Sequence, residues 1–288
     1  MQRVASPLWL KALDHLFLMR PMLMPPLWTI SILGYGQGQR QDVSPDWTTL
    51  LYPIAVFTLL TGGVYVQNQV FDLEGDRANN KLFLLGDGYI SLRAAGLQTW
   101  GCYLGAVILA FFHSTWFGAL MCGALLLGSQ YNAPPLRMKD RPVEGLLYNV
   151  VIYGGFAFVT GWMGLADFSL DLLLKTIPYC LGVGAIYLNP TLPDIPGDRA
   201  AGKITIAVKY GYDTAATLAG VMLAVAVITG WIVDDLYIAI PSLLALPLFV
   251  KMRVTRNVED VALATKMGVL LLALAAVLTY PPYLALLI

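Results

Sequence analysis

Two ten-residue segments repeat one arrangement of acidic and basic residues. Residues 72–81 read DLEGDRANNK and residues 194–203 read DIPGDRAAGK, with six identical positions. Residues four apart share one face of a helix, so the two aspartates of each copy can bind the same group. Clustered carboxylates repel one another unless cations neutralise them, and oxygen ligands without His or Cys favour Mg²⁺. The repeat therefore predicts a site where Mg²⁺ and phosphate oxygens bind together.

Further side chains extend each copy of the repeat. Asn68 lies one turn before Asp72 and adds an amide oxygen to the same stripe, whereas Glu74 faces away. The predicted metal ligands are Asn68, Asp72, Asp76, Asp194 and Asp198. The cations that follow the aspartates are expected to donate hydrogen bonds to a diphosphate: Arg77, Lys81, Arg199 and Lys203. A single copy would be better explained by a solvated interfacial ion pair, but the duplication, the carboxylate pairs four residues apart and Asn68 together favour the metal–diphosphate site.

Residues 131–139, with the sequence YNAPPLRMK, form a third polar segment between the two copies. Pro134 and Pro135 are expected to end the preceding helix, because the residue before each proline is pushed out of the helical region. Tyr131 then lies at the membrane boundary, with Lys139 among the cations just beyond it. Taken alone, this pattern is typical of an interfacial tyrosine followed by cations that set the topology.

The composition indicates that these segments belong to an integral membrane protein. Hydrophobic residues make up 58% of the 288 residues, charged residues make up 12%, and the mean hydropathy is +0.67. A soluble chain of this size would have too few charges to cover its surface. The 18 basic and 18 acidic residues cancel, so no net positive field favours a nucleic-acid partner. The N-terminus lacks an apolar core followed by a small-residue cleavage site, and we expect no removable signal peptide.

Apolar segments long enough to cross the hydrocarbon core cover the whole chain. We predict nine transmembrane helices at residues 15–36, 49–71, 95–113, 115–131, 145–166, 170–189, 211–233, 236–252 and 263–287. Sixteen of the 18 Lys and Arg residues fall on one side of this arrangement, leaving only Arg40 and Lys175 opposite. The positive-inside rule then places the N-terminus and both aspartate segments on the cytoplasmic side. Each copy follows an even-numbered helix, which suggests an internal duplication around residues 68–81 and 190–203.

Together, the three segments resemble the UbiA superfamily of intramembrane prenyltransferases. That family has an Asn-Asp-xx-Asp-xxx-Asp motif after helix two, an Asp-xxx-Asp motif after helix six, and a Tyr-Ser-x-Pro-Pro-like segment after helix four. The sequence matches them at Asn68, Asp72 and Asp76, at Asp194 and Asp198, and at residues 131–135. Two departures concern the first motif: Gln69 stands where the family usually has Asp, and residues 81–88 replace its usual Arg-Pro-Leu segment.

The resemblance implies one all-α domain over residues 1–288, with nine helices around a central cavity. It implies a transferase that moves an isoprenoid chain from a prenyl diphosphate to a lipophilic acceptor, such as an aromatic quinone precursor. Two Mg²⁺ ions would bridge the diphosphate to the aspartates. Asp72, Asp76, Asp194, Asp198 and Tyr131 would be catalytic, with Tyr131 positioning the allylic carbon or stabilising the cation. Asn68, Arg77, Lys81, Lys139, Arg199 and Lys203 would bind substrate.

Two alternative functions fit parts of the same pattern. Repeated helical units and intramembrane polar groups also occur in transporters, which would use the cytoplasmic-side metal or anion site. Against this, the acidic groups lie at helix ends on one side, and the third, fifth, seventh and ninth predicted helices are nearly free of charge. A prenyl-diphosphate cyclase or lipid-binding scaffold of the same fold would keep the diphosphate site and dispense with the acceptor.

Overall fold

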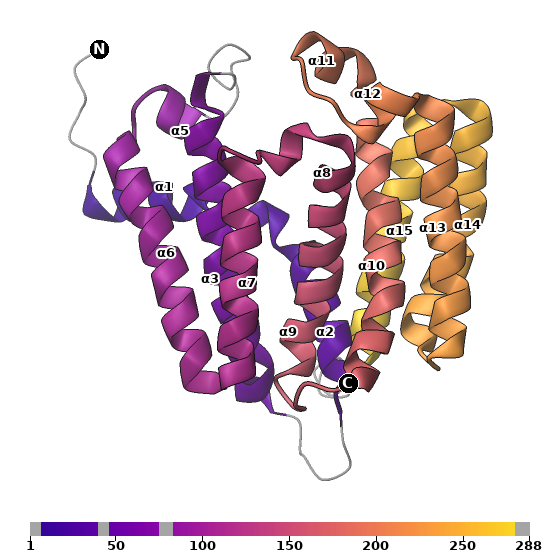
Figure 1. The fold of residues 1–288 in the computed structure, drawn as a ribbon, viewed down its shortest axis with the longest axis horizontal. Helices are drawn as coiled ribbons and strands as arrows, with labels where there is room; N and C mark the ends of the chain where they lie inside the picture. The colour runs from indigo at the N-terminus through magenta and orange to yellow at the C-terminus, as the bar shows by residue number, and fades with distance from the viewer. Residues whose placement is uncertain (1–6, 40–45, 75–82, 280–288) are drawn as a thin grey trace. The chain divides into compact units, whose positions relative to one another are not determined.

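The computed structural model describes residues 7–39, 46–74 and 83–279. The described residues form helices and connecting turns and contain no β-strand, which confirms the all-α prediction (Figure 1). The chain divides into two compact units. Unit 1 comprises residues 1–25 and 55–137, and unit 2 comprises residues 26–54 and 138–288. The first aspartate segment therefore belongs to unit 1 and the second to unit 2.

Unit 1 is built from helices whose ends are set by serine caps and prolines. Its helices are α1 (Leu8–Leu18), the 3-10 turn η1 (Pro21–Leu23), most of α3 (Trp47–Phe71), α5 (Phe83–Gly86), α6 (Leu92–His113) and α7 (Thr115–Asn132). Ser91 caps α6, and Ser114 both follows α6 and caps α7 by accepting a hydrogen bond from the Phe117 amide. α6 and α7 consequently lie side by side as an antiparallel pair (Figure 1).

Buried polar contacts attach α1 to the rest of unit 1. The Gln98 amide donates to the His15 carbonyl at 2.8 Å, and the Gln69 amide donates to the Leu18 carbonyl at 2.7 Å. Leu18 also packs in an apolar cluster with Val66 of α3. Gln69, a departure from the family motif, therefore makes a structural contact with the helix end at Leu18.

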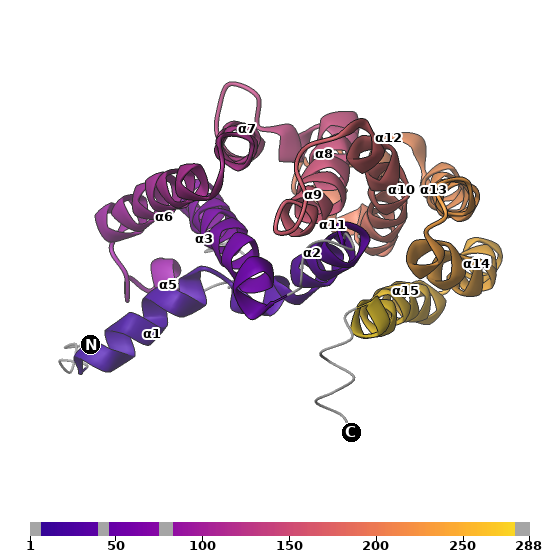
Figure 2. The ribbon, with the colours of Figure 1, turned by 90° about the horizontal axis from the view of Figure 1, so that it is seen from below.

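Unit 2 begins with α2 (Pro25–Gln37) and contains most of the remaining helices. After the 3-10 turn η2 (Met138–Asp140), a continuous helical segment comprises α8 (Pro142–Asn149), the π-helix η3 (Val150–Phe156) and α9 (Ala157–Trp162). Long helices α10 (Leu170–Thr191), α13 (Tyr212–Ile232), α14 (Leu236–Thr255) and α15 (Val258–Thr279) pack as successive neighbours (Figure 2). Two short helices, α11 (Ile195–Ala200) and α12 (Ile206–Tyr210), connect α10 to α13.

Glycines allow two backbones of unit 2 to approach closely. A Cβ atom added to Gly161 in α9 would overlap the Ser31 carbonyl oxygen of α2, and one added to Gly34 would overlap the Phe158 carbonyl oxygen. Any side chain at either position would therefore separate these two helices. A larger apolar core cluster of unit 2 includes Leu188, Leu223 and Phe249.

The predicted helix over 15–36 is wrong as a single element. α1 ends at Leu18, Arg20 adopts a left-handed conformation with φ 53°, and η1 separates α1 from α2. Pro21 and Pro25 cannot donate backbone hydrogen bonds, which explains the break. The last predicted helix begins five residues earlier than expected, at Val258, and its described part ends at Thr279.

Within the part of the chain that the structure describes, seven helical segments are long and apolar enough to cross a membrane: α3, α6, α8–η3–α9, α10, α13, α14 and α15. The broken pair formed by α1, η1 and α2 would be an eighth. α7 lies where the fourth predicted helix was placed and is not among these candidates. The count of nine spans and the cytoplasmic N-terminus therefore stay predictions.

Candidate metal and diphosphate site

The first aspartate segment follows the end of α3 in unit 1. Asn68 lies in the last turn of α3, and the Asp72 amide donates to the Asn68 carbonyl at 2.9 Å, which continues the helical turn through Asp72. Both side chains are half-buried, whereas Glu74 is exposed, consistent with its predicted orientation. Asp76, Arg77 and Lys81 lie outside the described residues.

The buried side chain of Asn132 orients Asn68. Asn132 is fully buried at the end of α7, and its Nδ2 donates to the Val64 carbonyl of α3 at 3.0 Å. Since a carbonyl only accepts, this contact fixes which side of the Asn132 amide is nitrogen. Its Oδ1 then accepts from Asn68 Nδ2 at 2.8 Å. The oxygen of Asn68 consequently faces away from Asn132, as a metal ligand requires.

Three more polar residues form hydrogen bonds beside this pair of amides. Tyr103 of α6 donates its hydroxyl to Gln67 Oε1 at 2.9 Å, and Gln67 Nε2 donates to Ser129 of α7 at 3.4 Å. Hydrogen bonds therefore join α3, α6 and α7 next to the first aspartate segment. Buried polar groups with satisfied hydrogen bonds hold neighbouring side chains in one arrangement. This network fixes the end of α3 from which Asn68 and Asp72 project.

Arg137 is a partner of the first motif that sequence reasoning counted only as a topology cation. Its Nη2 lies 3.7 Å from Asp72 Oδ1. Arg137 adopts a left-handed backbone conformation with φ 39°, which is uncommon for a residue with a Cβ atom.

Tyr131 is half-buried in the last turn of α7. As the proline pair predicted, α7 ends one residue later, at Asn132.

The second aspartate segment forms the short helix α11 in unit 2. Asp194 precedes α11 and is exposed, and its carbonyl accepts from the Asp198 amide at 2.8 Å. The Asp198 side chain is only 14% exposed, and its Oδ1 lies 3.4 Å from Lys203 Nζ. The structure thus brings together the predicted ligand Asp198 and the predicted diphosphate contact Lys203. Arg199 lies in the same helix with its side chain exposed.

A glycine cap on α11 places Lys203. Gly202 has φ 70°, and its amide donates to the Arg199 carbonyl at 3.2 Å. The Lys203 amide donates to the Asp198 carbonyl at 2.9 Å. These two bonds form a Schellman motif, in which a left-handed glycine turns the chain back over the helix end. The turn of the backbone therefore brings Lys203 close to Asp198, and the opposite charges of the two side chains favour the same approach.

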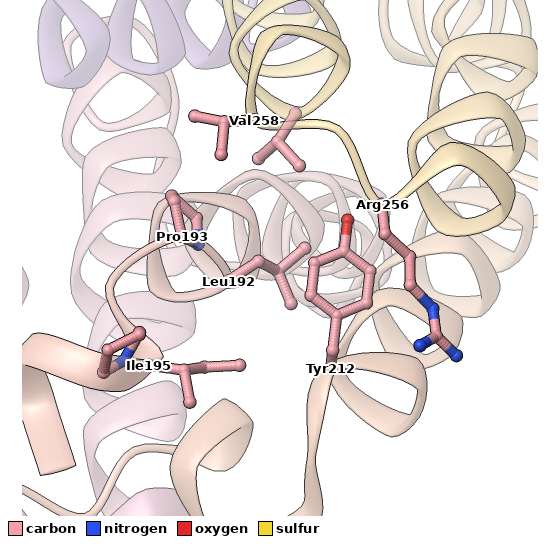
Figure 3. Close-up of a pocket in the computed structure, with 8 residues that line it drawn as sticks. Leu192, Pro193, Ile195, Tyr212, Arg256 and Val258 are labelled. Carbon is pink, nitrogen blue, oxygen red and sulfur yellow. The ribbon is translucent and has the colours of Figure 1, made fainter.

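An apolar pocket of about 320 Å³ lies under the second motif (Figure 3). Four of its lining residues flank Asp194 in sequence, namely Leu192, Pro193, Ile195 and Pro196, and the other four are Tyr212, Arg256, Val258 and Val261. Tyr212 is held by a hydrogen bond from its hydroxyl to the Met252 carbonyl at 2.9 Å. Because the lining is mainly apolar, this pocket does not itself provide oxygen ligands for a metal ion.

Asn189 is a buried polar residue that sequence reasoning missed. It lies in the last turn of α10, five residues before Asp194, and is fully buried. Neither polar atom of its side chain has a hydrogen-bond partner among the described residues. Burying an unpaired amide is unfavourable by roughly 1–3 kcal/mol. The signal in the sequence was an asparagine one turn before the second motif, at nearly the position that Asn68 holds before the first.

Lys139 is buried in η2 with 8% of its surface exposed, in the same unit as the second motif.

Within the described ranges, no three His, Cys, Asp or Glu side chains gather into a cluster that could hold a metal. Each described half nevertheless presents hard oxygen atoms beside cations, Asp72 with Arg137 and Asp198 with Lys203. Each of the two pairs, taken by itself, has the donor chemistry that suits Mg²⁺ together with a phosphate group.

Comparisons with known proteins agree with this chemistry. A model of the UbiA prenyltransferase family matches residues 27–275. Chloroplastic chlorophyll synthase from Arabidopsis thaliana is 27% identical over 218 residues, which cover 70% of this chain and 54% of that protein. Homogentisate phytyltransferase from Synechocystis sp. is 24% identical over 239 residues, covering 77% and 76%. The chain therefore spans about half the length of the first of these relatives.

A solved structure shows the same fold. The structure of a UbiA homolog from Archaeoglobus fulgidus bound to GPP and Mg²⁺ superimposes with a TM-score of 0.72 and 20% sequence identity. The match covers 92% of this chain and 99% of the other. At this identity the likeness establishes the fold.

Proposed function

Because the chain belongs to the UbiA prenyltransferase family, we propose that it transfers an isoprenoid chain from a prenyl diphosphate to a lipophilic or aromatic acceptor within the membrane. The observation that carries the proposal is the duplicated aspartate segment, with Asn68 oriented by Asn132 in one copy and Asp198 beside Lys203 in the other. A relative named for homogentisate and phytyl transfer, and a homolog bound to GPP and Mg²⁺, support this chemistry.

The residues that would hold two Mg²⁺ ions are Asn68, Asp72, Asp76, Asp194 and Asp198. When bound, the ions offset the negative charge that develops on the diphosphate as it departs. All five side chains offer oxygen atoms, which suits Mg²⁺ better than a softer metal. The Asn68 amide is already turned so that its oxygen is available.

Cations beside the aspartates bind and orient the diphosphate. We assign this role to Arg77, Lys81, Lys139, Arg199 and Lys203, and add Arg137 because its guanidinium lies 3.7 Å from Asp72. Arginine contacts phosphate oxygens in pairs, and lysine contributes a point charge. Lys203 Nζ lies 3.4 Å from Asp198 Oδ1. A phosphate that binds the same Mg²⁺ ion as Asp198 would therefore lie close to Lys203.

The bond between the diphosphate oxygen and the allylic carbon breaks, and the electron pair leaves with the diphosphate. A nucleophilic atom of the acceptor then bonds to that carbon and loses a proton. Tyr131 is assigned to position the allylic carbon or to face the cation with its ring. Apolar helices around the prenyl chain exclude water, which would otherwise capture the cation. The charge asymmetry of the loops supports placing this site on the cytoplasmic side.

Binding of geranyl diphosphate to the detergent-purified protein, with and without Mg²⁺, tests the donor site. We expect Mg²⁺-dependent binding in the wild type and its loss in the Asp72→Ala/Asp198→Ala double variant. Glu74→Ala is the matched control, because its carboxylate is exposed and was predicted to face away from the site. Full binding by the double variant, or binding without Mg²⁺, would contradict the proposed metal ligands.

Product analysis then separates the transferase from its alternatives. With an added acceptor such as homogentisate, a transferase yields the prenylated acceptor and free diphosphate. A cyclase of the same fold releases diphosphate from the donor without an acceptor. Flux into proteoliposomes with no product of either kind would instead identify a transporter.

A further inference from the structure

A groove of about 510 Å³ lies between α13 and α14 in unit 2, separate from the pocket under α11. Its lining residues are Asp213, Thr214, Thr217, Leu218, Val221 and Arg253. The polar members lie near the start of α13 and the end of α14, and the apolar members follow one turn deeper along α13. Both helices are candidate membrane spans, so the groove joins a polar helix end to a surface suited to hydrocarbon.

Arg253 differs in its pairing from the other cations at this end of α14. Lys251 lies 2.8 Å from Asp260, and Arg256 pairs with Asp213. Arg253 Nε donates to the neutral hydroxyl of Thr217 at 2.6 Å, and no carboxylate among the described residues pairs with it. The only acidic residue of the groove is thus neutralised by Arg256, while the guanidinium of Arg253 keeps its positive charge. The polar end of the groove therefore suits an anion.

The apolar part of the groove continues along one face of α13. Leu218 and Val221 line the groove, and Val225 and Ile228 follow at helical spacing with 37% and 57% of their surfaces exposed. Eleven residues separate Thr217 from Ile228, which corresponds to about 16 Å of helix. One leaflet of a bilayer contributes about 15 Å of hydrocarbon. The apolar stripe is therefore about as long as one acyl chain.

We propose that this groove binds one anionic glycerophospholipid. The phosphodiester would accept hydrogen bonds from Arg253 and from the hydroxyls of Thr214 and Thr217, and an acyl chain would lie along Leu218 and Val221. A soluble phosphate would use only the polar end, and a zwitterionic lipid would gain less from Arg253. Basic residues at a cytoplasmic membrane boundary attract anionic lipid headgroups. The groove shares no lining residue with the pocket beside the second aspartate segment, and the proposal does not depend on the proposed transferase activity.

Thermal unfolding of the detergent-purified full chain tests the proposal with three additives: phosphatidylglycerol, phosphatidylcholine and soluble glycerol 3-phosphate. We expect phosphatidylglycerol to raise Tm more than phosphatidylcholine, and glycerol 3-phosphate to leave Tm unchanged at the same concentration. Arg253→Ala should abolish the difference between the two lipids and weaken phosphatidylglycerol binding, measured by native mass spectrometry, by about five- to tenfold. Lys251→Ala, which removes the same charge from the same helix, should keep the difference because Lys251 pairs with Asp260.

A second variant tests the acyl part of the groove. Val221→Trp leaves Arg253 and both threonines intact while filling the apolar end, so it should also remove the preference for phosphatidylglycerol. An unchanged lipid preference in both Arg253→Ala and Val221→Trp would show that only nonspecific surface lipid is bound. An equal shift with glycerol 3-phosphate would show a free-anion site instead, and equal shifts with both lipids would refute recognition by charge.

Discussion

Replacing Asn132 by leucine is expected to weaken Mg²⁺ binding although Asn132 is not itself a predicted metal ligand. Leucine has the same branched shape, although it is larger, and it removes the amide hydrogen bonds of Asn132, including the one from Asn68 at 2.8 Å and the one to the Val64 carbonyl at 3.0 Å. Asn68 then loses the contact that turns its oxygen away from α7. Its side chain can rotate, and fewer of its conformations present the oxygen to a cation.

The magnitude follows from two separate effects. Leaving the Asn68 amide without its buried partner destabilises the fold by roughly 1–3 kcal/mol. Loss of an outer residue that orients a metal ligand typically weakens metal binding by about 10–100-fold. We therefore expect the Mg²⁺ concentration for half-maximal binding of geranyl diphosphate to rise by about 10–100-fold, with near-normal binding at saturating Mg²⁺.

Gln69→Leu is the matched control. Gln69 is a buried amide next to Asn68 on the same helix, but it donates to the carbonyls of Leu18 and Tyr65 at 2.7 and 3.0 Å. Its loss should lower Tm by a similar amount and leave the Mg²⁺ requirement within about twofold, because metal affinity depends on the groups that orient the ligand. The assay is a Mg²⁺ titration at fixed geranyl diphosphate, with Tm measured in parallel.

Two results would refute this reasoning. An unchanged Mg²⁺ requirement in Asn132→Leu would mean that Asn68 is oriented by something else or does not bind the metal. An equal increase in Gln69→Leu would mean that general loosening of α3, and not the orientation of Asn68, controls the affinity. Asn132→Ser keeps a small acceptor and should restore part of the affinity only if the hydrogen bond to Asn68 is responsible.

Three further changes test other parts of the structure. Gly202→Ala forces a Cβ into a left-handed position and should weaken diphosphate binding by displacing Lys203 from Asp198, by about 1 kcal/mol or fivefold, in the same binding assay. Burial raises the pKa of Asp235, although the hydrogen bond from Tyr179 partly opposes this shift. The stability of the fold should therefore fall as pH rises through that pKa. In Asp235→Asn, Tm measured from pH 4 to 7 should depend less on pH. Asn189→Leu should raise Tm because an unpaired amide is removed, and unchanged geranyl diphosphate binding would show that Asn189 does not contact the substrate.

The positions of most helices could be predicted because each depends on local sequence. Apolar length located the long helices to within a few residues, and the proline pair correctly placed the end of α7. The break between α1 and α2 was missed because a hydropathy average does not register the prolines at 21 and 25. The π-helix at 150–156 has no comparable sequence signal, and the close approach of its Gly154 to the Cys180 backbone joins residues far apart in the chain.

The candidate site was predictable where its residues are neighbours in sequence. The repeated aspartates, the outward position of Glu74 and the proximity of Lys203 to Asp198 all follow from spacing within one or two helical turns. The contact between Asn68 and Asn132 joins residues 64 apart, and no periodicity within either helix identifies such a partner.

Asn132 shows why such partners matter more here than in a soluble site. Asn132 is fully buried, so the Asn68 amide donates to an oxygen held inside the protein, and this hydrogen bond sets its orientation. Asn132 in turn is oriented by a backbone carbonyl, which no substitution at Val64 removes. The chain Val64, Asn132, Asn68 thus transfers the fixed direction of a helix carbonyl to a predicted metal ligand. The Asp72 amide donates to the Asn68 carbonyl, so the main chain of Asp72 continues the same helical turn.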